Sequence, residues 1–165
     1  MVHALFFLLF SLLISKQIWR DIQTRTLSDL DSILLFFIGI GYAWQSTDPI
    51  SHGLVVLVIL ILAIVMVFAT TIGGGDVKLM MALAPWFALT DLMFFVVLLL
   101  FFVSGLHFIR QHLGVQYLLQ LTPEQVNRQL LPLGVPIGLA AWLVVCFAIM
   151  VDWGVDHIEI IRSVA

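Results

Sequence analysis

The sequence predicts an all-α membrane protein, a polytopic bundle of about six transmembrane helices with one short interfacial helix. Of its 165 residues, 62% are hydrophobic and only 10% are charged, whereas soluble domains carry about a quarter charged residues. The apolar residues also gather in long runs of the length that crosses a bilayer. Because no polar linker or internal repeat divides the chain, we expect a single transmembrane domain over residues 1–165.

The predicted spans follow one another with short connections. They cover Val2–Trp19, Ser28–Trp44, Gly53–Ile72, Val77–Leu89, Leu92–Ile109 and Pro132–Val151. The fourth run is short for a full crossing. Tryptophans lie near several span ends, where an aromatic belt is expected, namely Trp19, Trp44, Trp86 and Trp153.

The segment 111–131 differs from the spans because it mixes leucines with glutamines. Thr122 followed by Pro123 is a typical helix start, so we expect a short helix from Pro123 to Leu131 lying along the membrane interface. Two interpretations of this segment stay open. It is either a simple connector or a surface that receives the soluble end of a substrate.

The basic residues predict the orientation of the bundle. Six of the seven lysines and arginines fall on one side of it, namely Lys16, Arg20, Arg25, Lys78, Arg110 and Arg128. The positive-inside rule assigns that side to the cytoplasm, so both termini are expected outside. The net charge of −3, with scattered basic residues, argues against a nucleic-acid partner. The lone Cys146 provides neither a disulfide nor a cysteine zinc site.

Acidic residues close to hydrocarbon are costly and mark candidate functional sites. Four lie near spans on the basic side: Asp21, Asp29, Asp31 and Asp76. Asp76 directly follows Gly73, Gly74 and Gly75, which permit a sharp chain reversal and leave peptide groups open to an extended substrate. The alternative is that the glycines only turn the chain and Asp76 caps the next helix.

The neighbours of the two aspartates leave further alternatives open. Asp21 has the spacing of a helical ion pair with Arg25, but Arg25 has the same spacing to Asp29, which would leave Asp21 available. Lys78 lies two residues after Asp76, so on a helix the two side chains point apart. We therefore expect Lys78 to reach lipid phosphates or substrate.

Asp21 ends the first span and Asp76 opens the fourth, on the same side of the bundle. If these helices are neighbours, the two carboxyls share one proton. The ionised member then activates a water molecule while the protonated member donates to a scissile carbonyl. This chemistry requires no metal and no cofactor. His107 and His112 are five residues apart without an evident third ligand, so we expect no metal site.

Three motifs resemble those of the type IV prepilin peptidases, a family of membrane aspartyl proteases. Gly73–Lys78 resembles the family's GxGD signature in its GGGDxK form, and Asp21–Arg25 resembles its first-aspartate segment. Pro132–Ile137 resembles a recurrent P-x-G-x-P-like element of the last span. In one departure, Leu27–Asp29 stands where the family often has Ile-Pro-Asn.

The resemblance implies that Asp21 and Asp76 are the catalytic pair, and that the glycines at 73–75 and Lys78 shape the site or bind substrate. It implies that the substrate is a type IV pilin or pseudopilin precursor. The positively charged leader would be cut just before the hydrophobic helix, at the cytoplasmic face of the bacterial inner membrane. The chain is similar to the compact Flp-type (tight-adherence) peptidases, and methyltransferase activity is not expected.

Two other functions remain as alternatives. A small proton-linked transporter or channel would use the same aspartates as a relay, although no paired broken spans or inverted repeat of the transporter kind are evident. A catalytically inactive component of a pilus or protein secretion machine is the second, and the altered Leu27–Ser28 region favours it. The sequence does not indicate an oligomeric state.

Overall fold

A computed structural model describes residues 2–24, 26–69, 74–113 and 133–164. Over these ranges all regular secondary structure is helical, which confirms the predicted all-α membrane fold. They are α1 (Val2–Thr24), α2 (Asp29–Gln45), α3 (Pro49–Ala69), α4 (Gly74–Leu83), the short 3₁₀ helix η1 (Ala84–Trp86), α5 (Leu89–Leu113) and α7 (Gly134–Val164). The predicted interfacial helix at 123–131 lies outside the described residues.

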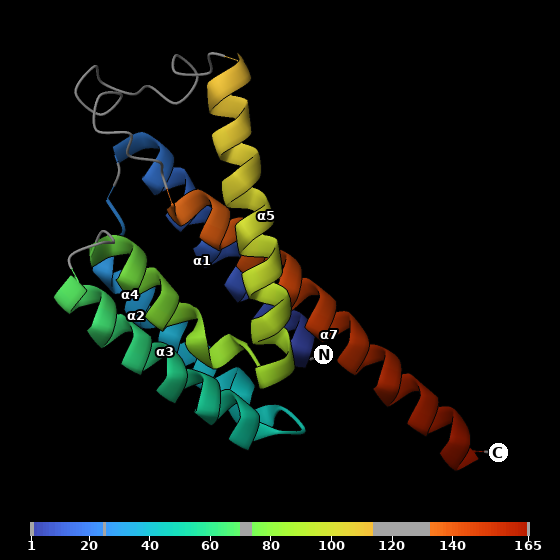
Figure 1. The fold of residues 1–165 in the computed structure, drawn as a ribbon. Coiled ribbons are helices and arrows are strands. Elements are labelled where there is room, and N and C mark those ends of the chain that lie inside the picture. The colour runs from blue at the N-terminus through green and yellow to red at the C-terminus, as the bar shows by residue number, and fades with distance from the viewer. Residues whose placement is uncertain (1, 25, 70–73, 114–132, 165) are drawn as a thin grey trace.

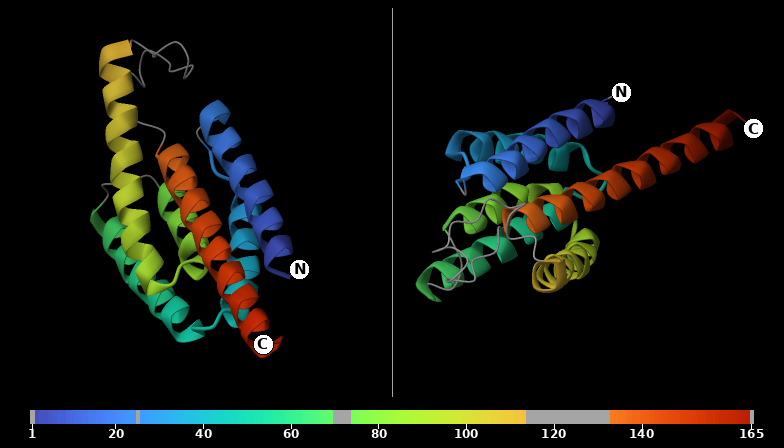
Figure 2. Two further views of the ribbon diagram at one scale, coloured as in Figure 1. Left: turned by 90° about the vertical axis from the view of Figure 1, so that its right-hand side faces the viewer. Right: turned by 90° about the horizontal axis from the view of Figure 1, so that it is seen from above.

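The helices run back and forth, so alternate helix ends meet at one end of the bundle (Figure 1). There α1 ends and α2 begins, and α4 and α7 also begin, whereas the start of α1 and the end of α7 lie toward the opposite end (Figures 1 and 2). α1 packs against α2 and α7, and α4 packs against α2, α3 and α7. The end of α1 and the start of α4 therefore lie at the same end of the bundle.

Several helices are long enough and apolar enough to cross a membrane. Among the described residues these are Val2–Thr24, Leu89–Ile109 and Gly134–Val151, with Pro49–Val65 as a shorter apolar helix. At the usual rise per residue, α4 and η1 together extend about 21 Å, against a hydrocarbon core of roughly 30 Å. The expectation that the fourth span is short is thus correct.

The core forms around Trp86 of η1, which is fully buried. Its indole Nε1 donates a hydrogen bond of 2.9 Å to the Leu35 carbonyl, and its ring stacks on Tyr42. Gly39 lets the indole approach α2, because a Cβ there would lie 2.6 Å from Nε1. The prediction of an interfacial position is therefore wrong for Trp86: the short fourth span ends inside the bundle and carries this side chain into the core.

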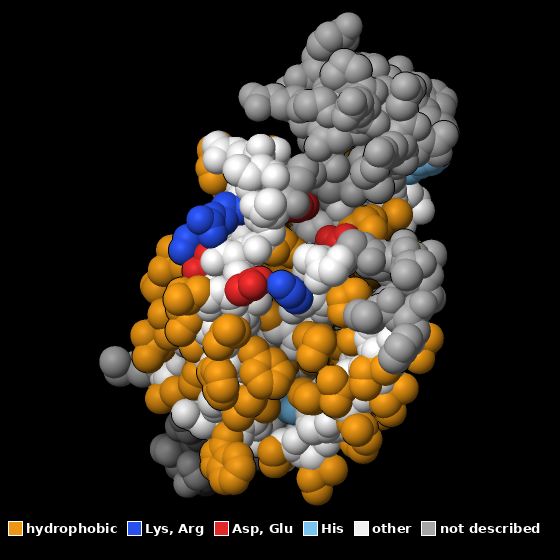
Figure 3. Space-filling model, turned by 90° about the vertical axis from the view of Figure 1, so that its left-hand side faces the viewer, with side chains coloured by type: hydrophobic (Ala, Val, Ile, Leu, Met, Phe, Trp, Pro, Cys, Tyr) orange, Lys and Arg blue, Asp and Glu red, His pale blue; other side chains and the backbone are white. Residues whose placement is uncertain are grey.

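The outer surface agrees with a lipid environment. Large apolar side chains are exposed along α5, including Met93, Val97, Leu100 and Phe101. On the face shown in Figure 3, charged side chains gather toward one end and hydrophobic side chains cover most of the remainder. Such a division places one end of the bundle at a polar boundary and the rest in hydrocarbon.

Candidate active site

Asp21 lies on the buried face of α1. The buried residues of this helix are Phe10, Ile14, Gln17 and Asp21, a spacing that keeps one helix face toward the core. Asp21 is only 6% exposed. Its carboxyl lies against the first residue of α7, since a Cβ added at Gly134 would be 2.6 Å from Asp21 Oδ2. The absent side chain at position 134 thus makes room for this carboxyl.

The side-chain amide of Gln17, one helical turn before Asp21, is buried and holds this part of α1 against the start of α2 through hydrogen bonds. Its Nε2 donates to the Ser28 carbonyl (3.1 Å) and to Ser32 Oγ (3.0 Å), and its Oε1 accepts from the Ser28 N–H (3.2 Å). Because the Gln17 side chain is fully buried, these bonds fix the position of the helix turn that precedes Asp21.

An ion pair strengthens the same junction. Asp31 on α2 is 2% exposed, and its Oδ1 accepts a hydrogen bond of 2.8 Å from Lys16 Nζ. Arg20 Nη1 lies 3.9 Å from Asp31 Oδ2. Two basic side chains of α1 thus neutralise one buried acid of α2, which gives Asp31 a structural explanation.

Asp76 is the third residue of α4 and is partly buried. Because α4 begins at Gly74, Gly74 and Gly75 belong to the first helical turn and Asp76 is not the N-cap. Gly73, the first of the three glycines, lies outside the described residues. Among the described residues, a Cβ at Gly74 would meet nothing within 4 Å, whereas one at Gly75 would contact Leu27 at 3.5 Å. The described side chains thus leave space beside the backbone just before Asp76.

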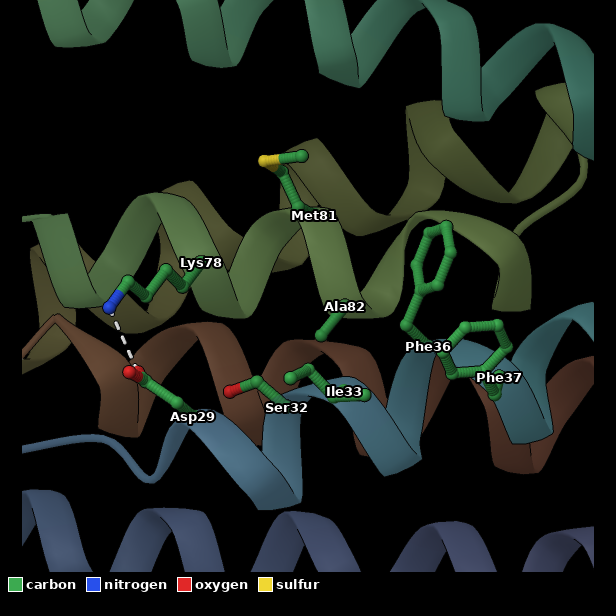
Figure 4. Close-up of a pocket in the computed structure, with 8 residues that line it drawn as sticks. All are labelled: Asp29, Ser32, Ile33, Phe36, Phe37, Lys78, Met81 and Ala82. Atoms are coloured by element: carbon green, nitrogen blue, oxygen red, sulfur yellow. Dashed lines mark hydrogen bonds and ion pairs between the residues drawn. The ribbon is translucent and has the colours of Figure 1, made fainter.

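Lys78, which was expected to reach lipid phosphates or substrate, forms an ion pair within the protein (Figure 4). Its Nζ donates a hydrogen bond of 2.8 Å to Asp29 Oδ1 in the first turn of α2. Asp29 therefore pairs with Lys78, and the pairing with Arg25 that its spacing also allowed is not tested. The sequence separation of 49 residues hid this contact from local spacing rules. Arg25 itself lies outside the described residues.

The end of α1, which carries Asp21, and the start of α4, which carries Asp76, lie at the same end of the bundle (Figure 1). α1 and α4 each pack against both α2 and α7. Two contacts hold the start of α4 in this region. Leu27, in the connection after α1, lies beside Gly75, and Asp29, at the start of α2, pairs with Lys78. No group of three histidines, cysteines or acids within the described ranges is arranged to hold a metal ion.

Sequence reasoning assigned no role to Gly134 or Gln17. Gly134 belongs to the P-x-G-x-P-like element at the same end of the last span. This motif indicated where Gly134 lies along the chain but not that it lies against Asp21. Gln17 is a polar residue late in an apolar span, four residues before Asp21. That one-turn spacing puts the two side chains on one helix face and was the available signal.

The fold and the site define a polytopic membrane protein with acidic side chains at one end of its helical bundle. Residues 5–109 match the type IV leader peptidase family, so the chain belongs to that family. It is a protease of the type IV leader peptidase kind, as the prepilin peptidase resemblance implied. The matched range contains Asp21 and Asp76 but ends before α7. Searches among curated proteins and solved structures found no match.

Proposed function

We propose that this protein is an aspartyl endopeptidase that removes the N-terminal leader of type IV pilin-like precursors, with Asp21 and Asp76 as its catalytic residues. The observation that carries the proposal is that the helix ends bearing Asp21 and Asp76 lie at one end of the bundle, within a segment that matches a leader peptidase family. We further propose that the substrate is of the Flp tight-adherence type, and that residues 1–165 act as one peptidase domain.

The proposed reaction is peptide hydrolysis by an acid–base pair. The ionised carboxyl takes a proton from water as the water oxygen attacks the scissile carbonyl carbon, and the protonated carboxyl donates to the carbonyl oxygen. When the C–N bond breaks, the first carboxyl returns its proton to the leaving amine. The second recovers a proton from the hydroxyl of the tetrahedral intermediate, so the pair ends with the single proton it began with.

The surroundings of Asp76 support access by an extended peptide. Apart from the adjoining backbone, no atom of the described residues lies within 4 Å of a Cβ position at Gly74, so in this proposal a substrate backbone approaches the chain there. The glycines at 73–75 thus shape the site in this proposal. Lys78 shapes it through its ion pair with Asp29. Gly134 provides the space that the Asp21 carboxyl occupies.

Charge supports a cytoplasmic site. Lys16, Arg20 and Lys78 lie in the parts of α1 and α4 that meet at the end of the bundle with Asp21 and Asp76. The positive-inside rule places such an end at the cytoplasmic face of the bacterial inner membrane. Since α1 begins and α7 ends toward the opposite end, both termini are proposed to lie outside.

Mass spectrometry of a co-expressed tight-adherence pilin precursor tests the proposal. The protein should yield a new N-terminus at the junction of the leader and the hydrophobic helix, and Asp21→Asn and Asp76→Asn should each abolish it. Asp48→Asn is the matched control, because Asp48 follows α2 at the opposite end of the bundle. An uncut precursor in the presence of folded wild-type protein refutes the function, and cleavage by either active-site variant removes that residue from the pair.

A further inference from the structure

A cavity lies at the end of the bundle opposite to the candidate active site. It is formed where α2 ends and where α3 and α5 begin (Figure 1), against the middle of α7. Its volume is about 480 Å³, within the range of ligand-binding pockets. Among the described residues, its lining contains two aspartates, one histidine and no lysine or arginine. The cavity is therefore polar and acidic.

His52 is the buried polar side chain of this cavity. It is only 5% exposed, and its Nδ1 lies 3.0 Å from the Pro85 carbonyl oxygen. Because a carbonyl oxygen only accepts hydrogen bonds, Nδ1 carries the proton in this contact, and Nε2 of the neutral ring is left as an acceptor. No donor to Nε2 comes from the part of the chain that the structure describes. Buried polar atoms have partners as a rule, so Nε2 indicates a ligand that donates.

The two aspartates cap helices and also give the cavity its charge. Asp91, in the first turn of α5, is partly buried, and its Oδ2 accepts a hydrogen bond of 3.0 Å from the Ala88 N–H. Asp48, directly before α3, is exposed, and its Oδ1 accepts one of 3.1 Å from the Ser51 N–H. The starts of α3 and α5 and the end of α2 each add about half a unit of charge, two positive and one negative. The lining thus stays net negative.

A contact between two helix starts brings His52 and Asp91 to the same cavity. Ser51 Oγ accepts a hydrogen bond of 2.7 Å from the Leu89 N–H, which joins the start of α3 to the start of α5. His52 follows Ser51, Asp91 is two residues after Leu89, and both line the cavity. Asp91 is the better placed of the two acids, because solvent screens the exposed Asp48 more strongly.

A buried acceptor beside a carboxylate fits an ammonium group. An ammonium carries a positive charge and several N–H donors, and it has no acceptor. A metal ion fits less well, because no group of three histidines, cysteines or acids in the described ranges is arranged to hold one.

The apolar part of the lining points to a lipid as the source of the ammonium. Phe94 of α5 and Phe147 of α7 line the cavity, lie with ring centroids 5.8 Å apart, and are both exposed. Exposed apolar side chains of membrane-spanning helices face lipid. We infer that the cavity binds the primary ammonium of an aminophospholipid headgroup, with Asp91 as the charge partner and His52 Nε2 as the acceptor. This inference does not rest on the proposed function.

Native mass spectrometry of the detergent-solubilised protein, titrated with single phospholipids, tests the inference. The probes are phosphatidylethanolamine, its N,N-dimethyl derivative and phosphatidylcholine, which have stepwise fewer N–H donors at the same charge. Phosphatidylethanolamine should saturate one site, and the apparent Kd should rise about tenfold or more toward phosphatidylcholine as charge-assisted hydrogen bonds are lost. Equal Kd values for the three lipids overturn the inference. Displacement of the lipid by an equal concentration of free ethanolamine overturns the lipid as the source.

Two variants test the assigned residues. Asp91→Asn removes the charge but keeps an oxygen for the Ala88 N–H. His52→Asn keeps an N–H donor for the Pro85 carbonyl but has no counterpart of Nε2. Each should raise the Kd for phosphatidylethanolamine about tenfold. Asp29→Asn, which removes an exposed acid of α2 outside this cavity, should bind as the wild type does.

The unfolding temperature of each variant is measured in parallel. A folded Asp91→Asn protein with the wild-type Kd, or an equal loss of binding in Asp29→Asn, overturns the site. If a variant does not fold, the lipid series with the wild-type protein decides alone.

Discussion

Gly134→Ala should inactivate the peptidase by moving one carboxyl. The added Cβ would lie 2.6 Å from Asp21 Oδ2 and 2.8 Å from its Cγ, whereas ordinary contacts begin at 3.4 Å. The Asp21 carboxyl must therefore move by about 0.8 Å, and a misplacement of about 1 Å in a catalytic group costs roughly 10²-fold in rate. The expected fall in kcat of about 100-fold corresponds to about 2.7 kcal/mol of barrier.

The assay is the initial rate of precursor cleavage by purified protein, with the unfolding temperature measured in parallel. Gly138→Ala is an informative control because its Cβ would lie 2.6 Å from Ile18 Cγ1, so it crowds α1 against α7 without meeting the carboxyl. Gly105→Ala adds the same methyl group in open space. If Gly134→Ala retains more than about a third of wild-type kcat, or if Gly138→Ala loses as much activity at equal stability, the reasoning about Asp21 fails.

Two further predictions concern the packing that supports the site. Gln17→Leu leaves the partly buried N–H of Ser28 without its Gln17 partner and should lower the free energy of unfolding by about 1–3 kcal/mol. An unchanged denaturation midpoint in detergent would show that this amide does not hold α1 against α2. Gly39→Ala drives a methyl group against Trp86 and should cost about 1–3 kcal/mol, whereas Gly41→Ala, whose nearest contact is 3.5 Å, should not. Equal unfolding temperatures for these two variants would contradict the described packing of Trp86.

The helices were predictable because long apolar runs report directly on residence in a bilayer. The fifth predicted span, Leu92–Ile109, lies within α5, and the sixth, begun at Pro132, starts two residues before α7. The common end of Asp21 and Asp76 was also predictable, since each crossing reverses direction. Their catalytic roles remain a proposal.

Contacts between distant helices were not predictable from the same pattern. Periodicity shows which face of a helix is apolar, but not which helix covers that face. The Lys78 side chain was expected to reach lipid or substrate because its partner, Asp29, lies 49 residues away. In the same way, nothing local to Trp86 indicated that Gly39 would admit its ring.

The central claim is that Asp21 and Asp76 act as one unit, and the most direct measurement is the cleavage rate of the double variant compared with the two single ones. Residues that act together show strongly non-additive losses. Asp21→Asn and Asp76→Asn should each lower kcat by at least about 10³-fold, and the double variant should lose no more than either. Losses that multiply in the double variant, or a single variant that still cuts at the wild-type rate, would contradict the account.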